Sequence, residues 1–164
     1  MSMDFSAKSA MGAALLAWWN QLQEDRGARA ELRRCRNVDE VVMTAAFQRL
    51  CSRMKPVFSG QSGWEERLAA IAGLLSHVKV VETGLSLAHQ MSEGNPPVIS
   101  ESRFRRLLQR DRADLYPAMI RVLRMLKGKA DIHEIAHAVF YWGNGVKKQW
   151  AYTYYPNVQV KKTA

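Results

Sequence analysis

Apolar side chains recur at helical spacing along most of the chain. Four stripes follow the spacing i, i+4, i+7, i+11, which places their members on one side of an α-helix. They comprise Met11, Leu15, Trp18 and Leu22; Met43, Phe47, Leu50 and Met54; Trp64, Leu68, Ile71 and Leu75; and Leu115, Met119, Val122 and Leu126. Strand-like alternation is confined to a Val-rich piece near Lys79 and to residues 158–160. The pattern therefore predicts an all-α fold.

Several short polar residues stand where helices are expected to begin. Asn37 with Glu40, Ser62 with Glu65, and Asp131 with Glu134 have capping-box spacing, in which an acceptor side chain and a carboxylate each satisfy a free N–H. Ser100 has the position of a further N-cap, with Ile99 and Phe104 placed as a hydrophobic staple across it.

Glycine and proline divide the expected helices at residues 56–63 and 92–97. The second break contains Gly94, Pro96 and Pro97, which end one helix and prevent its continuation. We therefore predict two small helical bundles, residues 1–93 and 98–164, joined by a short Gly/Pro linker. A chain of 164 residues buries enough apolar surface to fold without a disulfide or metal staple.

The charge is strongly positive and unevenly distributed. Lys and Arg number 24 against 15 Asp and Glu, a formal net charge of +9. Residues 26–55 hold eight basic and three acidic groups, and residues 101–129 hold nine and three, whereas residues 56–100 hold two and four. Clustered positive charge favours a polyanion as partner, above all a nucleic acid.

The second basic segment is expected to form an arginine-rich helix. On a helical wheel, Phe104, Leu107 and Leu108 form the core stripe, Arg103, Arg106 and Arg110 share one flank, and Arg105 and Arg112 share the other. Arg121 and Arg124 lie opposite the apolar stripe of the following helix. We expect a phosphate chain to bind along the first flank; the alternative is an ordinary solvated helix face, which would normally mix both signs of charge.

Basic residues also lie near expected ends of the bundles. Arg33 and Arg34 belong to a basic turn between two longer helices, and Lys147 and Lys148 follow the turn that starts the last helix. Aromatic side chains interleave with these lysines and can stack on bases. The alternative, which we favour for Trp142, Trp150 and Tyr154 individually, is that each packs in the core.

One short motif is typical of zinc peptidases. His133-Glu134-Ile135-Ala136-His137 matches H-E-x-x-H, in which two imidazoles one turn apart bind zinc. A third ligand is missing downstream, because no His, Asp or Glu follows His137. Glu134 is also explained as half of a capping box with Asp131. We therefore predict no metal site and no cofactor.

The remaining chemistry is sparse. Cys35 and Cys51 lack the spacing of a disulfide framework or zinc ribbon and are interpreted as reduced cytosolic thiols. The apolar segment Ala10 to Trp19 is too short to span a bilayer, so we expect a cytoplasmic protein without a membrane partner. Because phosphate loops, nucleophile elbows and carboxylate pairs are also lacking, the sequence favours a binding module over an enzyme.

Taken in order, several segments resemble the CasB family, the small subunit of the type I-E Cascade CRISPR surveillance complex. They are Trp18-Trp19, Leu32-Arg33-Arg34, Ala46-Phe47-Gln48-Arg49-Leu50, the segments 83–88 and 100–112, and Tyr141-Trp142-Gly143. The resemblance covers nearly the whole chain. It implies two helical bundles, present as two copies in the complex, without catalytic activity.

The resemblance also implies partners and a binding surface. The partners are the crRNA-containing Cascade subunits, namely the backbone and the large subunit, a second copy of the chain, and target DNA with its displaced strand in the R-loop. The family's basic positions correspond to Arg34, Arg103, Arg112, Arg121 and Lys147, and the helical wheel adds Arg33, Arg106, Arg110 and Lys148. The chain departs from the family at Asn144-Gly145, where relatives often place a basic residue.

Three other functions stay open at this point. The HEIAH motif leaves a zinc metallopeptidase, and clustered arginines that face acidic subunits would make the chain a purely structural protein–protein subunit. A helix-turn-helix repressor is disfavoured, because the arginine-rich helix is followed by Asp114-Leu115-Tyr116-Pro117 instead of a Gly-containing turn.

Overall fold

The structure is a computed structural model that describes residues 3–58 and 60–163. Within this part the chain forms ten α-helices and one pair of very short strands, which confirms the all-α prediction. The elements are α1 (Ala10–Glu24), α2 (Arg26–Arg33), α3 (Val38–Val42), α4 (Ala45–Met54), α5 (Trp64–Leu75), β1 (Val80–Val81), α6 (Leu87–Ser92), α7 (Glu101–Leu108), α8 (Arg112–Met125), β2 (Lys129–Ala130), α9 (Ile132–Phe140) and α10 (Asn144–Thr163). None of these helices is long and apolar enough to cross a membrane.

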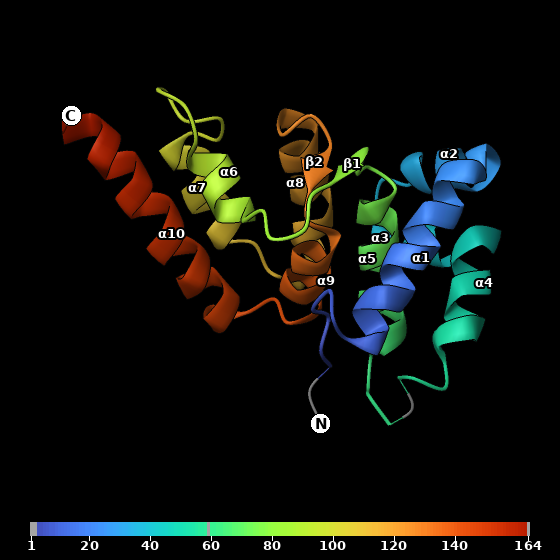
Figure 1. Cartoon of the computed structure of the whole chain (residues 1–164). Coiled ribbons are helices and arrows are strands. Elements are labelled where there is room, and N and C mark those ends of the chain that lie inside the picture. The colour runs from blue at the N-terminus through green and yellow to red at the C-terminus, as the bar shows by residue number, and fades with distance from the viewer. Residues whose placement is uncertain (1–2, 59, 164) are drawn as a thin grey trace.

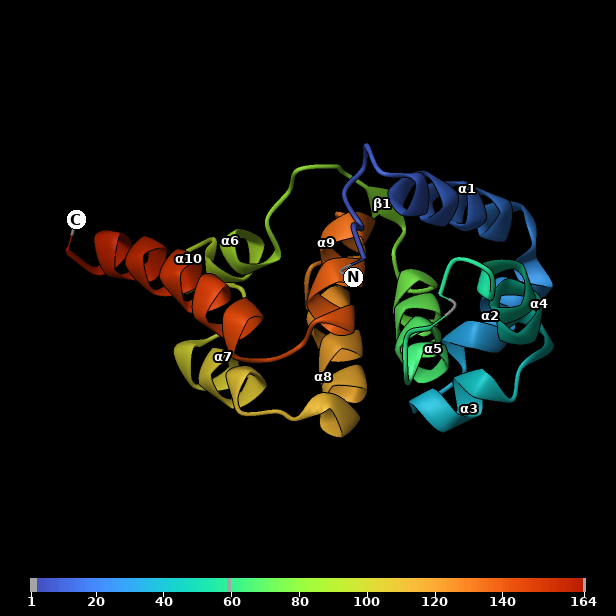
Figure 2. The same ribbon diagram turned by 90° about the horizontal axis from the view of Figure 1, so that it is seen from below.

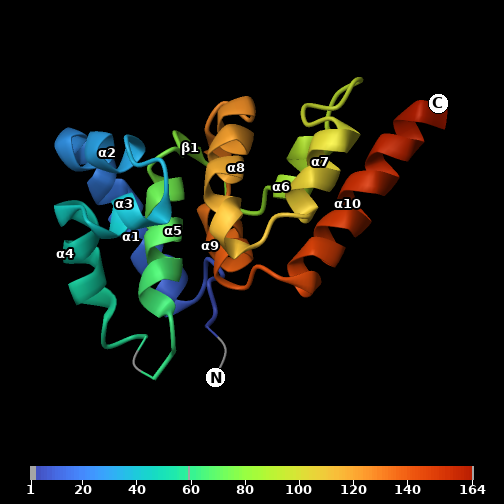
Figure 3. The same ribbon diagram turned by 180° about the vertical axis from the view of Figure 1, so that it is seen from behind.

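The helices are arranged in three groups across the molecule. Helices α1 to α5 lie on one side, α8 and α9 form the middle, and α6, α7 and α10 lie on the other side (Figures 1 and 2). The middle pair packs against α5, and α9 also contacts α1, while α10 packs mainly against α6. Seen from behind, α7 lies between α8 and α10 (Figure 3).

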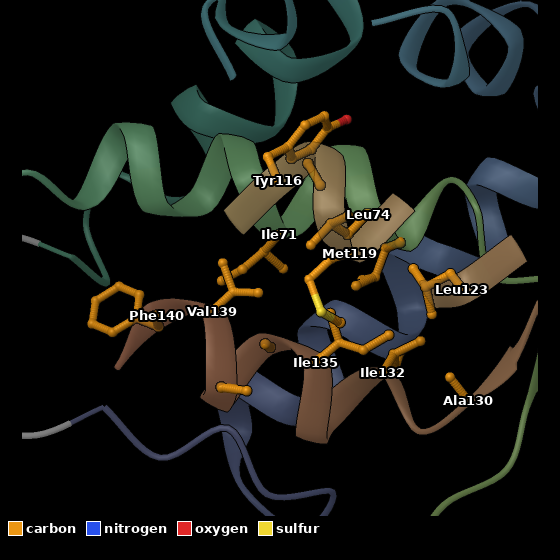
Figure 4. Packing of buried hydrophobic residues seen from close by; sticks show 14 of the residues in the cluster. Ile71, Leu74, Tyr116, Met119, Leu123, Ala130, Ile132, Ile135, Val139 and Phe140 are labelled. Atoms are coloured by element: carbon orange, nitrogen blue, oxygen red, sulfur yellow. The ribbon is translucent and has the colours of Figure 1, made fainter. Parts of the chain in front are cut away.

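The core forms where α5, α8 and α9 meet. Ile71 and Leu74 of α5 face Met119 of α8 and Ile135 of α9, and all four side chains are buried (Figure 4). Most members of the four predicted stripes are buried in the core, as packing of one helix face requires. Met43 is an exception, because it follows the end of α3 and is 76% exposed.

The Val-rich piece near Lys79 forms the only strand pairing in the described residues. Val80 and Val81 of β1 pair in parallel with Lys129 and Ala130 of β2. The Lys79 N–H also donates to the Gly128 carbonyl at 2.7 Å. This short pairing joins the end of the first helical group to the middle pair. The other piece, residues 158–160, is helical and belongs to α10.

Three of the four expected N-cap residues cap a helix; one is Asp131, whose side chain accepts from the His133 N–H at the start of α9. The Asn37 side chain accepts from the Glu40 N–H, and the Ser100 side chain accepts from the Arg103 N–H. The prediction for Ser62 is wrong, because the N-cap of α5 is Gly63. This glycine adopts a left-handed backbone conformation and has no side chain that could accept a hydrogen bond. A left-handed conformation favours glycine, so the backbone determines this helix start.

Packing crosses the predicted boundary between the two bundles. Helix α6 precedes the Gly/Pro segment but packs against α10, at the far end of the sequence. The Lys161 ammonium donates to the carbonyls of Ser92 and Gly94, and Asn157 donates to the Ser92 hydroxyl at 2.7 Å. The division into residues 1–93 and 98–164 thus stays a prediction about folding units, since the buried side chains form one cluster across it.

One close contact in the core depends on a glycine. A Cβ atom added to Gly73 of α5 would lie 2.2 Å from the Tyr116 hydroxyl oxygen and 2.8 Å from two atoms of the ring. Tyr116 is 1% exposed, so its ring cannot move into solvent without opening the core. The absence of a side chain at Gly73 therefore lets α5 and α8 approach closely.

We predict that Gly73→Ala lowers the free energy of unfolding by about 1–3 kcal/mol, the range found for overpacked cores. Gly145→Ala is the matched control, because it adds the same methyl group to a helix where no atom lies within 4 Å. Helix propensity alone should make the control neutral or stabilising by up to about 1 kcal/mol. Urea denaturation measures both; equal effects of the two substitutions would contradict the predicted steric clash.

Candidate nucleic-acid interface

An arginine-lined groove runs between α7 and α8. Phe104 and Leu107 bury one side of α7, and Leu115, Met119 and Leu123 bury one side of α8. Because these apolar faces point into the core, the basic residues of α7 and α8 line the two sides of the groove between the helices. The groove has a volume of about 390 Å³ and contains Arg103, Arg106, Arg110, Arg121 and Arg124.

The floor of the groove is apolar. Ile99, Leu107, Ala118 and Val122 line it between the two arginine rows. Such a floor lowers the local dielectric and focuses the field of the surrounding charges. The groove thus presents a concentrated positive potential to a ligand that enters it.

The arginines of the groove keep their charges available. Within residues 3–58 and 60–163, ion pairs join Arg36 to Glu40, Lys129 to Glu82 and Lys162 to Glu101, and the imidazoles of His89 and His133 contact the carboxylates of Glu93 and Asp131. None of these pairs includes a groove arginine. Arg103 Nη1 lies 3.6 Å from the Met125 sulfur, and Arg106 Nε donates to the Ser102 carbonyl at 3.4 Å.

The predicted arginine helix is shorter than the wheel assumed. Helix α7 ends at Leu108, so Arg110 lies in the turn before α8. The backbone carbonyl of Arg110 accepts a hydrogen bond from the Trp142 indole N–H at 2.9 Å. Asp111 is exposed and caps α8 by accepting from the Asp114 N–H. The groove nevertheless brings Arg103, Arg106, Arg110 and Arg121 together.

Arg112 lies outside this groove. It is the first residue of α8, and its guanidinium donates to the Val139 carbonyl at 2.6 Å and to the Trp142 carbonyl at 3.2 Å. Burial, together with the positive charge of Arg67, lowers the pKa of Arg112. The placement of Arg112 on the flank of the arginine helix was therefore wrong, because its contacts hold α8 to the end of α9.

Arg33 and Arg34 lie at the end of α2. Arg33 Nε donates to the Ser76 carbonyl at 2.8 Å, whereas Arg34 is exposed. The residue after Ser76, His77, has its pKa lowered to about 4, first by burial and then by the charges of Arg33 and Arg124. Because Arg33 bonds the Ser76 carbonyl and the neighbouring His77 carbonyl lies beside Gly128, just after α8, the α2 cluster lies near the C-terminal end of α8.

The two lysines of α10 have different environments. Lys147 is half-buried, with its Nζ atom 5.4 Å from the centre of the Trp142 ring, and Lys148 is exposed. Trp142, Trp150 and Tyr154 are buried, which confirms the packing interpretation for these three aromatic residues. Tyr152 differs from them, because 80% of its surface is exposed.

The HEIAH motif connects three segments of the fold. Asp131 Oδ1 accepts from the His133 backbone N–H at 2.9 Å and lies 3.1 Å from His133 Nδ1; the other imidazole nitrogen lies 3.1 Å from the Gly12 carbonyl of α1. Asp131 Oδ2 accepts from the Gly84 N–H at 2.9 Å. In the described residues, no three His, Cys, Asp or Glu side chains are placed to hold a metal.

Glu134 bonds a different helix from the one expected. Its carboxylate accepts from the Leu87 N–H at 2.7 Å, at the start of α6, so the predicted reciprocal box with Asp131 is wrong. Burial raises the pKa of Glu134 to about 7, against the opposing effect of the Leu87 hydrogen bond. Because the folded protein favours the neutral acid, this stabilising contribution is present below pH 4.5 and is lost as pH rises through 7.

We predict that Glu134→Gln removes this pH dependence while its amide oxygen still accepts from Leu87. The free energy of unfolding of the variant relative to the wild type should increase by on the order of 2–3 kcal/mol between pH 5 and pH 8. Glu24→Gln, at the exposed end of α1, controls for the loss of one negative charge. Denaturant titrations across this pH range measure the difference; a constant difference would contradict the raised pKa.

The chain is similar to known proteins in sequence and fold. Residues 28–155 match the family model of CRISPR-associated protein Cse2. The fold is similar to that of a chain in the crystal structure of E. coli Cascade bound to a PAM-containing dsDNA target, at 24% identity over 90% of this chain and 96% of that chain, with a TM-score of 0.72. It is also similar to CasB from Thermus thermophilus, at 22% identity over 90% of this chain and 99% of that chain, with a TM-score of 0.66. No curated protein matches the chain.

Proposed function

The chain belongs to the CRISPR-associated Cse2 family, and on this premise we propose that it is a non-catalytic Cascade subunit that binds nucleic acid in the α7–α8 groove. One observation carries the proposal: five arginines line one groove, and no carboxylate of the described residues forms an ion pair with them. A similar fold in a Cascade complex bound to double-stranded DNA gives the ligand class additional support.

The groove suits a sugar–phosphate backbone better than base edges. Guanidinium groups bind phosphate oxygens through two parallel N–H donors, and they keep their charge at any physiological pH. Contacts to phosphates carry no sequence information, so binding is largely independent of base sequence. Each phosphate that is neutralised releases counterions, which makes the affinity fall steeply with salt.

Such binding shifts the equilibrium between closed and open target DNA. An R-loop exchanges a DNA duplex for a heteroduplex of similar stability, so modest contacts to the backbone decide which state prevails. By holding target DNA and the displaced strand, the groove stabilises the open state. Arg33 and Arg34, near the same end of α8, extend the positive surface, and Lys147 and Lys148 add charge on α10.

The same proposal includes the protein partners. The crRNA-containing backbone, the large subunit and a second copy of this chain are the expected neighbours, and the assembly acts in the cytoplasm. Arg112 contributes by fixing the start of α8, which carries one wall of the groove. Its predicted role in binding is thus proposed to be indirect.

Two alternatives make different demands on the molecule. A purely structural subunit would place the groove arginines against acidic partners, and the isolated chain would then bind nucleic acid weakly. A zinc peptidase would need His133 as a ligand, but both of its ring nitrogens face oxygens of the protein. The groove therefore favours nucleic-acid binding over both alternatives.

We predict that replacing Arg103, Arg106 and Arg110 together by Ala weakens binding of single-stranded DNA by about 10- to 100-fold at low salt. The slope of log K against log salt should become shallower by about 0.7 for each phosphate that the variant no longer neutralises, so by about 2 in the triple variant. Fluorescence anisotropy at several salt concentrations measures both quantities.

The control variant replaces Arg26, Arg49 and Arg53 by Ala. It removes the same charge from exposed positions of α2 and α4, outside the groove. Its salt slope should be nearly that of the wild type. If the two triple variants lose affinity equally, net charge and not the groove determines binding, and the groove proposal is wrong.

A further inference from the structure

The outer face of α10 combines exposed aromatic and basic side chains. Lys148, Tyr152, Tyr155 and Gln159 follow helical spacing and line a shallow hollow of about 420 Å³, together with Ala151 and Pro156. The Tyr152 side chain is 80% exposed, which is unusual for a large aromatic ring on a helix that has a well-packed opposite side.

The inner face of α10 fixes the direction of this stripe. Trp150, Tyr154 and Val158 are buried, and the Tyr154 hydroxyl donates to the Ile99 carbonyl. The Tyr154 ring also stacks on Phe104 of α7, with 3.8 Å between ring centroids and 8° between planes. Because the helix cannot rotate without unpacking these residues, Tyr152 is held outward.

The two tyrosines of the hollow have different roles. The Tyr155 ring meets Phe104 edge-on at 5.4 Å, so one of its edges is fixed against α7. Tyr152 has no such ring contact in the described residues, and at 80% exposure most of its ring is accessible to a ligand. Pro156 adds a second feature, since it lacks the N–H that would otherwise bond the Tyr152 carbonyl within the helix.

The charge of α10 is positive. Residues 144–163 contain four lysines and no acidic residue. Lys161 bonds carbonyls of the α6–α7 connection, Lys162 pairs with Glu101 at 2.7 Å, and Lys147 lies over Trp142. Lys148 is the lysine that lines the hollow, one turn before Tyr152.

Helix α7 carries a further exposed cation on the flank that borders α10. Glu101 of α7 pairs with Lys162 of α10, so this flank of α7 borders α10. Arg105 follows Glu101 by one helical turn and is exposed. The flank with Arg105 is opposite the one that faces the α8 groove, so the hollow and the groove lie on two sides of α7.

We propose that the α10 hollow is a stacking platform for an unpaired base of a single-stranded nucleic acid. The base stacks on the Tyr152 ring, and Lys148 and Arg105 bind the flanking phosphates. The excess of positive charge on α10 selects against a basic peptide, and an accessible aromatic ring stacks on any base without regard to sequence. The inference rests on the proposed function, because both sites take the same class of ligand.

The test uses the full chain and two strands of equal length. One is a dye-labelled oligothymidine of about 20 nucleotides, longer than one binding site, and the other is an abasic strand with the same phosphates. Tyr152→Ala should weaken binding of oligothymidine by about 5- to 100-fold, the loss expected for one stacked base. It should leave binding of the abasic strand, and the salt slope for either strand, unchanged.

Two matched variants define the cause of the loss. Tyr152→Phe keeps the ring and should bind oligothymidine as the wild type does. Val160→Ala trims another exposed apolar side chain of α10, outside the hollow, and should have no effect. Lys148→Ala should weaken both strands and make the salt slope shallower by about 0.7, because it removes a phosphate contact.

Failure of the platform and failure of the groove are distinguishable. The platform is overturned if Tyr152→Ala binds oligothymidine like the wild type, or if it weakens the abasic strand to the same extent. The groove is overturned if the Arg103, Arg106 and Arg110 variant keeps its affinity for both strands, whatever Tyr152→Ala does. A wild-type chain that binds neither strand overturns both.

Discussion

The burial of one face of α8 is the constraint on which the arrangement of the molecule depends. Leu115, Tyr116, Met119 and Leu123 are buried on α8, which packs against α5 and meets α9 in the core (Figure 4), and each fully buried side chain of this size contributes about 1.5–3 kcal/mol. Rotating α8 would expose several of them at once. The core therefore fixes the outward direction of Arg121 and Arg124, and it does so against the mutual repulsion of the groove charges.

Local patterns predicted the parts of the fold that depend on neighbouring residues. Burial at i, i+4 and i+7 follows from helix geometry alone, so the stripe from Met11 to Leu22 and that from Trp64 to Leu75 are buried as expected. The flank of Arg103 and Arg106 was predictable for the same reason. Arg124, noted only as lying opposite its stripe, joins them because α7 and α8 lie side by side.

These patterns did not predict contacts between segments that are distant in the sequence. Arg112 bonds the carbonyl of Val139, and Glu134 accepts from the N–H of Leu87; neither partner is marked by any spacing in the sequence. The HEIAH string illustrates the same limit, since its literal match to a zinc motif says nothing of the Gly12 carbonyl that faces His133. A spacing rule in the sequence does not identify hydrogen-bond acceptors that come close only when the chain is folded.

The contact between His133 and Gly12 has a consequence for the newly made chain. The two residues are 121 positions apart, and Phe5 likewise rests on Phe140, with 5.1 Å between the ring centroids. At translation rates of about 5–20 residues per second, roughly 6–25 seconds separate the synthesis of α1 from that of its partners on α9. During that interval the part of α1 that packs against α9 lacks its partner, so the nascent chain exposes apolar surface that the folded protein buries.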